Sequence, residues 1–179
     1  MKKIILTLIL ATLLFASCGQ NEVQDKNNLN KNKVVTQKNE NSTVVNKSNL
    51  YFSEGSIIVE KDKSTSVDLY IDTNGESITT IFIPFVYDKS ELTLDTKINE
   101  DEFDMIVKND KSSKGRVVSI SNTKGGIKGD KIKVLSLDIK SNTEEKTRIY
   151  IDEDYLSVLN PDNTELKMDK RIQLEITTK

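Results

Sequence analysis

The sequence has no histidine, no tryptophan, one cysteine and two prolines among its 179 residues. Without histidine, the chain lacks the commonest general base of enzymes and the commonest side-chain ligand of metals. The single cysteine, Cys18, excludes an internal disulfide, a cysteine-based zinc site and a Cys–His nucleophile. These absences argue against an enzyme, and we predict neither a metal nor another cofactor.

The formal net charge of −2 hides an uneven distribution. Residues 19–50 carry five lysines and three acidic residues, whereas residues 51–179 carry 19 basic and 25 acidic residues. Phosphate binding requires clustered Lys and Arg, and an anionic membrane surface attracts basic segments. The acidic main part of the chain therefore predicts that nucleic acid is not a partner.

Residues 1–17 have the three parts of a secretory signal peptide. Two lysines provide the positive start, residues 4–15 form an apolar run, and two small residues precede Cys18. The run is shorter than the roughly 20 apolar residues of a membrane-spanning helix. Residues 14–18 (Leu-Phe-Ala-Ser-Cys) resemble the lipobox of bacterial lipoproteins, although Phe15 stands where that pattern prefers leucine. The resemblance implies a lipid on Cys18 that holds the chain at the bacterial cell envelope, extracytoplasmic, on the cell membrane or the outer membrane.

Residues 18–50 follow as a polar linker behind the lipidated cysteine. Nine asparagines lie between residues 19 and 50, with only scattered valines and leucines. Such a composition cannot bury enough apolar surface to offset chain entropy. As a flexible coil, these residues would span about 30 Å. We expect a disordered tether there and a folded domain over residues 51–179.

The most apolar stretch after residue 50 is Ile81-Phe82-Ile83-Pro84-Phe85-Val86-Tyr87-Asp88. It alternates with a period of two and closes on a polar turn, which predicts a buried strand. Further strands are expected at residues 56–60, 67–71, 92–94, 103–107, 116–121, 132–139, 148–151, 156–159, 165–168 and 171–178. No stretch has a convincing helical period. The sequence predicts an all-β domain, an antiparallel β-sandwich of nine or ten short strands.

The order of these features resembles the cohesin family over about residues 52–178. The resemblance is carried by residues 67–72 (VDLYID), 83–88 (IPFVYD) with Leu92 four residues on, 118–126 (VSISNTKGG) and 129–140 (GDKIKVLSLDIK). The chain departs from the family at Lys89, where a proline is usual. The resemblance implies a nine-stranded jelly-roll β-sandwich and a non-catalytic role. Cohesins bind dockerin domains through one sheet face and their structural relatives bind polysaccharides, so the implied partner is a dockerin-like protein or a polysaccharide.

The apolar stretch also supplies candidate binding residues. Its odd-numbered residues from Ile83 to Tyr87 are expected to face the core, so Phe82, Pro84 and Val86 face the other way. An exposed apolar row there would suit a partner; the alternative is that a loop covers it. Pro84 has no N–H to donate to a sheet, which favours an edge strand or a bulge.

Tyrosines and acidic residues supply weaker candidates. Tyr70, Tyr150 and Tyr155 are candidates for stacking on a sugar ring, but most such tyrosines are structural. Acidic clusters at residues 100–104 and 152–154 would suit a glycosidase, yet nothing marks one acid as buried. Residues 72–76 contain Asn-Gly and lack the later ligands of a calcium loop, so they predict a turn.

The leading hypothesis is therefore a membrane-anchored, extracytoplasmic binding module that docks a dockerin-like protein or a polysaccharide on a sheet face. The alternative is a structural or adhesion lipoprotein of the envelope with no discrete ligand.

Overall fold

The structure, a computed structural model, describes residues 47–168 and 172–179. Cys18, the signal peptide and most of the linker lie outside the described residues. No helix in the described ranges is long and apolar enough to cross a membrane. The described chain forms eleven strands, which confirms the all-β prediction with a larger strand count: β1 (Asn49–Phe52), β2 (Ser56–Val59), β3 (Ser64–Asp72), β4 (Thr80–Val86), β5 (Leu92–Ile98), β6 (Met105–Lys111), β7 (Gly115–Ser121), β8 (Ile132–Ser141), β9 (Thr147–Ile151), β10 (Ser157–Leu159) and β11 (Gln173–Thr178).

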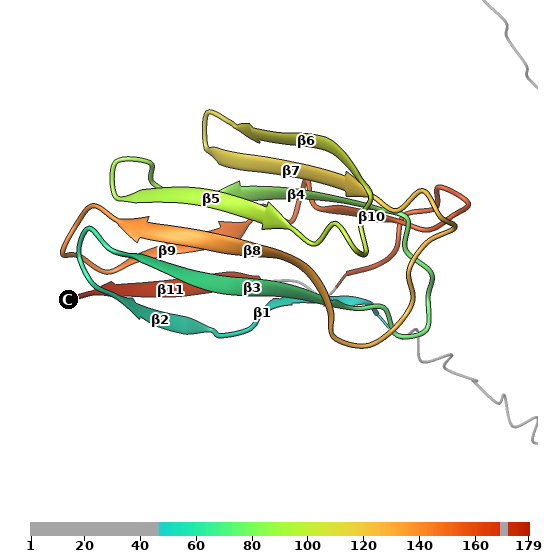
Figure 1. The fold of residues 1–179 in the computed structure, drawn as a ribbon, viewed down its shortest axis with the longest axis horizontal. Coiled ribbons are helices and arrows are strands. Elements are labelled where there is room, and N and C mark those ends of the chain that lie inside the picture. Colours follow the sequence, from blue (N-terminus) through green and yellow to red (C-terminus); the bar gives the residue numbers. More distant parts are fainter. Residues whose placement is uncertain (1–46, 169–171) are drawn as a thin grey trace, which may run out of the picture. The chain divides into compact units, whose positions relative to one another are not determined.

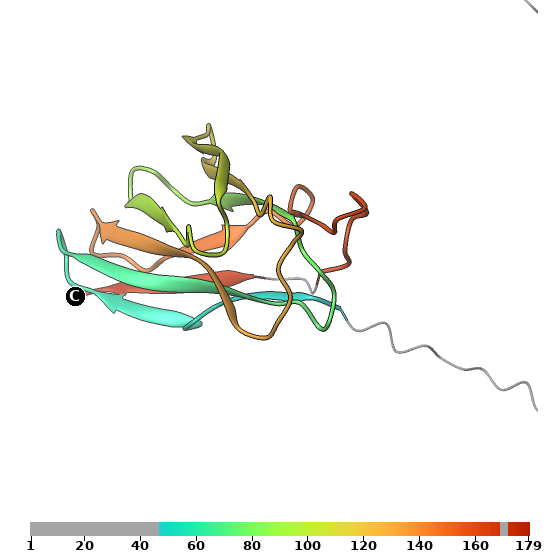
Figure 2. The ribbon, with the colours of Figure 1, turned by 45° about the vertical axis from the view of Figure 1, so that its right-hand side comes forward.

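The strands form two sheets that pack as the layers of a sandwich (Figure 1), and the layers separate when the molecule is turned (Figure 2). The smaller sheet has the order β1-β3-β8-β5. The larger has the order β2-β11-β9-β4-β7-β6, and β10 also pairs with β4. All named pairs are antiparallel except β2 with β11. The predicted sandwich is confirmed.

The core lies between the sheets and follows the period-two pattern of the sequence. In β3, Val67, Leu69 and Ile71 are buried and their neighbours are more exposed. Thirty buried apolar residues, the first Leu50 and the last Ile176, form one cluster. Residues 47–179 therefore contain a complete core of their own. The core begins slightly earlier than predicted, because Leu50 had been assigned to the linker.

Strand β4 is the centre of the larger sheet and carries the apolar stretch of the sequence. Ile83, Phe85 and Tyr87 are at most 7 % exposed, which confirms their predicted core positions. The edge position expected for Pro84 is wrong, because β4 lies between β7 on one side and β9 and β10 on the other. The N–H of Asp152 donates to the carbonyl of Pro84 (2.9 Å), so the proline nitrogen also points away from β7. The missing N–H thus costs no β4–β7 hydrogen bond.

The chain opposite Pro84 leaves the sheet for a few residues. Between the pairs Phe85–Ile151 and Phe82–Ser157, the chain from β9 to β10 takes six residue steps while β4 takes three. The surplus forms a turn at residues 152–156, which we call the flap. Backbone N–H groups of Tyr155 and Leu156 donate to the carbonyl of Asp152 and close this turn (3.2 and 2.9 Å). The predicted bulge is therefore present, but it lies in the neighbouring chain.

Two other predicted strands differ from the structure. Residues 165–168 contain only isolated bridges, Glu165 with Leu159 and Met168 with Ser48. The strand expected at residues 103–107 begins at Met105, and Phe103 before it is fully buried.

Candidate functional site

The outward side of β9, β4, β7 and β6, which we call the β4 face, collects three of the predicted strand residues. Cross-strand pairs place Phe82 opposite Ser119 and Pro84 opposite Val117. Val86 lies opposite Tyr150 of β9. Phe82 and Val86 are partly buried, Pro84 is buried and Tyr150 is 41 % exposed. The row predicted from sequence is therefore continuous with Tyr150, and it is covered in part.

The flap provides that partial cover. Its Leu156 is buried and anchors it, whereas Tyr155 is 64 % exposed. Tyr155 and Asp152 line a groove of about 320 Å³ together with Phe82, Pro84 and Val117. Residues 112–114 of the β6–β7 turn form the opposite wall. Both alternatives left open by the sequence thus hold in part, because a loop covers the apolar row and leaves a groove.

Exposed apolar side chains concentrate on and beside this face. Six large apolar side chains of the described chain are exposed, and five of them belong to β6, β9 or the flap. Edge strand β6 supplies three consecutive ones, with Val107 the most exposed at 59 %. The register of β6 shifts between Ile106 and Lys108, a bulge that makes pairing with a further strand difficult. The six are Ile58, Met105, Ile106, Val107, Tyr150 and Tyr155.

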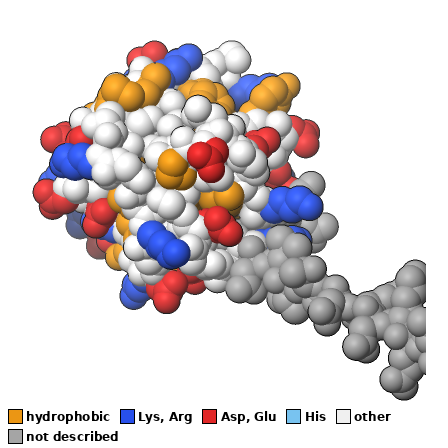
Figure 3. All heavy atoms as spheres, turned by 90° about the vertical axis from the view of Figure 1, so that its right-hand side faces the viewer, with side chains coloured by type: hydrophobic (Ala, Val, Ile, Leu, Met, Phe, Trp, Pro, Cys, Tyr) orange, Lys and Arg blue, Asp and Glu red, His pale blue; other side chains and the backbone are white. Residues whose placement is uncertain are grey.

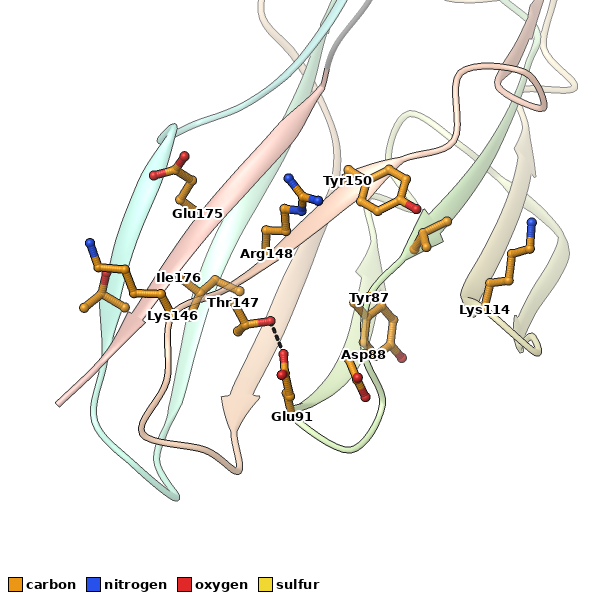
Figure 4. A pocket seen from close by; sticks show the side chains of 12 residues that line it. Tyr87, Asp88, Glu91, Lys114, Lys146, Thr147, Arg148, Tyr150, Glu175 and Ile176 are labelled. Atoms are coloured by element: carbon orange, nitrogen blue, oxygen red, sulfur yellow. Dashed lines mark hydrogen bonds between the residues drawn. The ribbon is translucent and has the colours of Figure 1, made fainter.

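A cleft of about 890 Å³ adjoins the groove at Val86 and Tyr150. It opens because β9 pairs with β4 only at Tyr150 and Ile151 and then diverges from it. Figure 4 shows Arg148 and Glu175 on one side of the cleft and Tyr87, Asp88 and Lys114 on the other. The Arg148 guanidinium lies 6.0 Å from the Tyr150 ring centroid. Burial raises the pKa of the Tyr87 hydroxyl, so this group stays a neutral donor.

The outward side of the smaller sheet, which we call the β3 face, is chemically different. Tyr70 lies there, so the structure separates it from Tyr150. Its ring stacks on Tyr51 with centroids 6.0 Å apart, and the Lys131 ammonium is 5.5 Å from its centroid. Its hydroxyl donates to Asp68, which also pairs with Lys133 (2.8 Å). Neighbours of its own chain thus contact the ring that was a candidate for sugar stacking.

The end of the sandwich near β10 presents no continuous apolar patch. Figure 3 looks at this end, where hydrophobic side chains form separate spots among charged ones. Asp104, from one acidic cluster, accepts hydrogen bonds from the Thr123 N–H (2.8 Å) and hydroxyl (2.7 Å), which lower its pKa. Nowhere in residues 47–168 and 172–179 do three or more Asp, Glu, His or Cys side chains come together as a potential metal site.

The turn predicted at residues 72–76 is confirmed. Asn74 and Gly75 both have positive φ angles (47° and 86°), as a tight turn of this type requires. The Asp72 carboxylate accepts the Asn74 N–H at 3.0 Å and so serves the turn.

The sequence had marked Phe82, Pro84, Val86 and Tyr150, but it gave no sign of Val117 or of the turn at residues 112–114. Val117 was placed inside a predicted strand, and its face depended on the pairing with Pro84. Only the exposure of Tyr155 could have been guessed, from its place in an acidic turn.

Comparison with known proteins gives the fold. No family model and no curated protein matches the sequence. Three similar solved structures are all cohesin modules. The cohesin CaCohA2 of Clostridium acetobutylicum, solved in complex with the dockerin CaDoc0917, is 17 % identical with a TM-score of 0.62, over 74 % of this chain and 99 % of that chain.

The second is a non-cellulosomal cohesin from the hyperthermophilic archaeon Archaeoglobus fulgidus, 14 % identical, with a TM-score of 0.60 over 75 % of this chain and 92 % of that chain. The third is the cohesin module of a Clostridium perfringens family 33 glycoside hydrolase, 11 % identical, with a TM-score of 0.59 over 74 % and 98 %. The resemblance seen in the sequence is thus confirmed for the fold: the folded part of this chain is a cohesin-like β-sandwich.

Proposed function

We propose that this chain is a non-catalytic binding module that docks a dockerin-like protein on its β4 face. The observation that carries the proposal is the concentration of exposed apolar side chains on and beside this face, around a groove of about 320 Å³. Contiguous apolar surface with a polar surround is typical of protein–protein sites. The complex of CaCohA2 with a dockerin supports the choice of partner class.

The β3 face supports the proposal by contrast. Its outward side chains are engaged in hydrogen bonds and ion pairs of their own sheet, such as Lys133–Asp68 and Ser136–Asp68 (2.7 Å). A partner would have to break these contacts to bind there, whereas the groove between Tyr155 and Val117 needs only to lose water.

A polysaccharide is the second candidate ligand, for one specific reason. Tyr150 and Tyr155 expose 41 % and 64 % of their surface on the same face, and exposed aromatic rings stack on sugars. This ligand would occupy the same site, so one experiment tests both.

We further propose that Cys18 carries a lipid that anchors the module at the bacterial cell envelope, extracytoplasmic, with residues 18–50 as the tether. Support comes from the lipobox-like sequence before Cys18. Metabolic labelling with a palmitate analogue in a bacterial host tests it. Label on the wild type and none on Cys18→Ser is expected; an unlabelled wild type would remove the anchor.

The binding test uses residues 19–179, which keep the whole core, and measures affinity by surface plasmon resonance. The probes are CaDoc0917 with other recombinant dockerin modules, and soluble cellulose and chitin oligosaccharides. Val86→Asp and Tyr155→Ala should each weaken binding of the responding probe at least tenfold, because each alters a wall of the groove.

Thr93→Asp is the matched control, since Thr93 is exposed on the β3 face. It should leave the affinity unchanged. A responding probe that tolerates both groove variants would refute the site. If no probe responds, the docking function loses its support, and the structural or adhesion role becomes the better hypothesis.

A further inference from the structure

The groove on the β4 face has opposite charges at its two ends. Lys114, in the β6–β7 turn, lines one end, and Asp152, in the flap, lines the other. Lys114 precedes Gly115, which pairs with Val86 from the β7 side. Asp152 follows Ile151, which pairs with Phe85 from the β9 side. The two charges therefore lie on opposite sides of β4, with Val86 between them.

Both ends are held in place by the fold. The Lys89 ammonium donates to the carbonyl of Ser112 (2.7 Å) and holds the turn that carries Lys114. Asp152 is fixed by its backbone bond to Pro84 (2.9 Å). Across β6, Lys108 and Asp110 face outward two residues apart and largely offset one another. The groove is thus an apolar strip between one positive and one negative end.

A second copy of the same chain is complementary to such a strip. In a two-fold dimer, the axis lies in the interface and each residue i that contacts residue j of the other copy is matched by j contacting i. An axis that bisects the line from Lys114 to Asp152 brings each lysine over the aspartate of the other copy. The same rotation brings Tyr155 over the residue 112–114 turn of the other copy, and keeps the Val86 side chains close together.

We propose that the β4 face self-associates as a two-fold dimer, with Lys114 of each copy paired with Asp152 of the other. The strip of β9, β4, β7 and β6 measures roughly 23 Å by 19 Å, about 440 Å² in projection. This is below the usual area of a stable interface, about 800 Å² per partner. The dimer is therefore weak and reversible. Resting on the proposed function, dimerisation would also block docking, because both occupy the groove beside Tyr155.

Sedimentation-velocity ultracentrifugation of residues 19–179 from about 10 µM to 1 mM tests the dimer in the absence of any other partner. Lys114→Asp and Asp152→Lys should each weaken association about tenfold, since each creates two repulsive contacts per dimer. The double variant Lys114→Asp/Asp152→Lys exchanges the charges and should restore most of the affinity. In the wild type, raising NaCl from about 50 to 500 mM should weaken association.

The control is Lys97→Asp/Asp138→Lys, two exposed residues of the β3 face, which should leave association unchanged. Circular dichroism confirms that each variant is folded. A monomer throughout the concentration range overturns the proposal. So does a double variant that is no tighter than the single ones, or a control that is as weak as they are. None of these results bears on the docking function, which is measured separately with dockerin and saccharide probes.

Discussion

Arg116 offers a test of how the open side of the sandwich is closed. It points inward from β7 and is only 9 % exposed. Its Nε donates to Asn109 Oδ1 (2.8 Å), and one terminal nitrogen donates to the Leu94 carbonyl (3.1 Å) and approaches Asp95 Oδ1 (3.3 Å). Leu94 belongs to β5, the edge of the other sheet. The guanidinium thus joins the two sheets where no backbone bonds can.

The magnitude depends on which of these contacts matters. The Asp95 side chain is 73 % exposed, and an exposed ion pair contributes about 0.5 kcal/mol. The Leu94 carbonyl and Asn109 have little access to water, so losing their donor costs about 1 to 3 kcal/mol for a buried group. Removing a buried charge returns part of this. We expect Arg116→Met to destabilise by about 2 to 3 kcal/mol and Asp95→Asn by less than about 0.5 kcal/mol.

Urea unfolding of residues 19–179, followed by far-ultraviolet circular dichroism, gives both values from the midpoint and slope. Arg116→Met keeps a long apolar side chain, so its effect reports the lost donors rather than a cavity. The reasoning is refuted if Asp95→Asn costs as much as Arg116→Met, because the ion pair would then dominate. It is also refuted if Arg116→Met is as stable as the wild type.

Two further predictions concern the backbone and the β3 face. A Cβ at Gly115 would lie 2.2 Å from a carbonyl oxygen of β4, whereas nothing lies within 4 Å of one at Gly55; Gly115→Ala should lower the free energy of unfolding by about 3 kcal/mol and Gly55→Ala by almost nothing, in the same urea assay. Burial tends to raise the pKa of Asp68, but hydrogen bonds from Lys133 and Ser136 outweigh it and hold the pKa below the ordinary 3.8. The charged form is therefore favoured on folding, which stabilises the protein above that pH and is lost as the pH falls through the lowered pKa. Between about pH 4 and pH 2 the wild type should lose more stability than Asp68→Asn, and equal losses would contradict the assignment.

The faces of β4 could be predicted because they depend only on local alternation. Once Ile83 faces the core, Phe85 and Tyr87 must do so too, and Phe82 and Val86 must face away. The same rule predicted the inward face of β3. Cross-strand partners, by contrast, are set by contacts between distant parts of the chain, and no local pattern names them. Tyr70 and Tyr150 therefore looked equivalent in the sequence, yet their strands belong to different sheets.

Pro84 shows how a correct local rule can lead to a wrong position. A proline cannot donate to a neighbouring strand, which makes an edge position the simplest expectation. In the structure, Pro84 is central, and its nitrogen points to the side where the chain leaves the sheet between β9 and β10. The ladder is interrupted opposite the proline rather than at the sheet's edge. The sequence contains the constraint but not the choice between these two solutions.

The interruption opposite Pro84 also builds the candidate site. Because the chain leaves β4 at Asp152 and returns at Ser157, three surplus residues must project over the face. Leu156 turns inward and is buried, and this orientation leaves Tyr155 outward beside the groove. A flap whose base is fixed by one backbone bond to Pro84 and one buried leucine can present an exposed ring without disturbing the core. The residue that departs most from a regular strand pattern therefore determines where the chain can receive a partner.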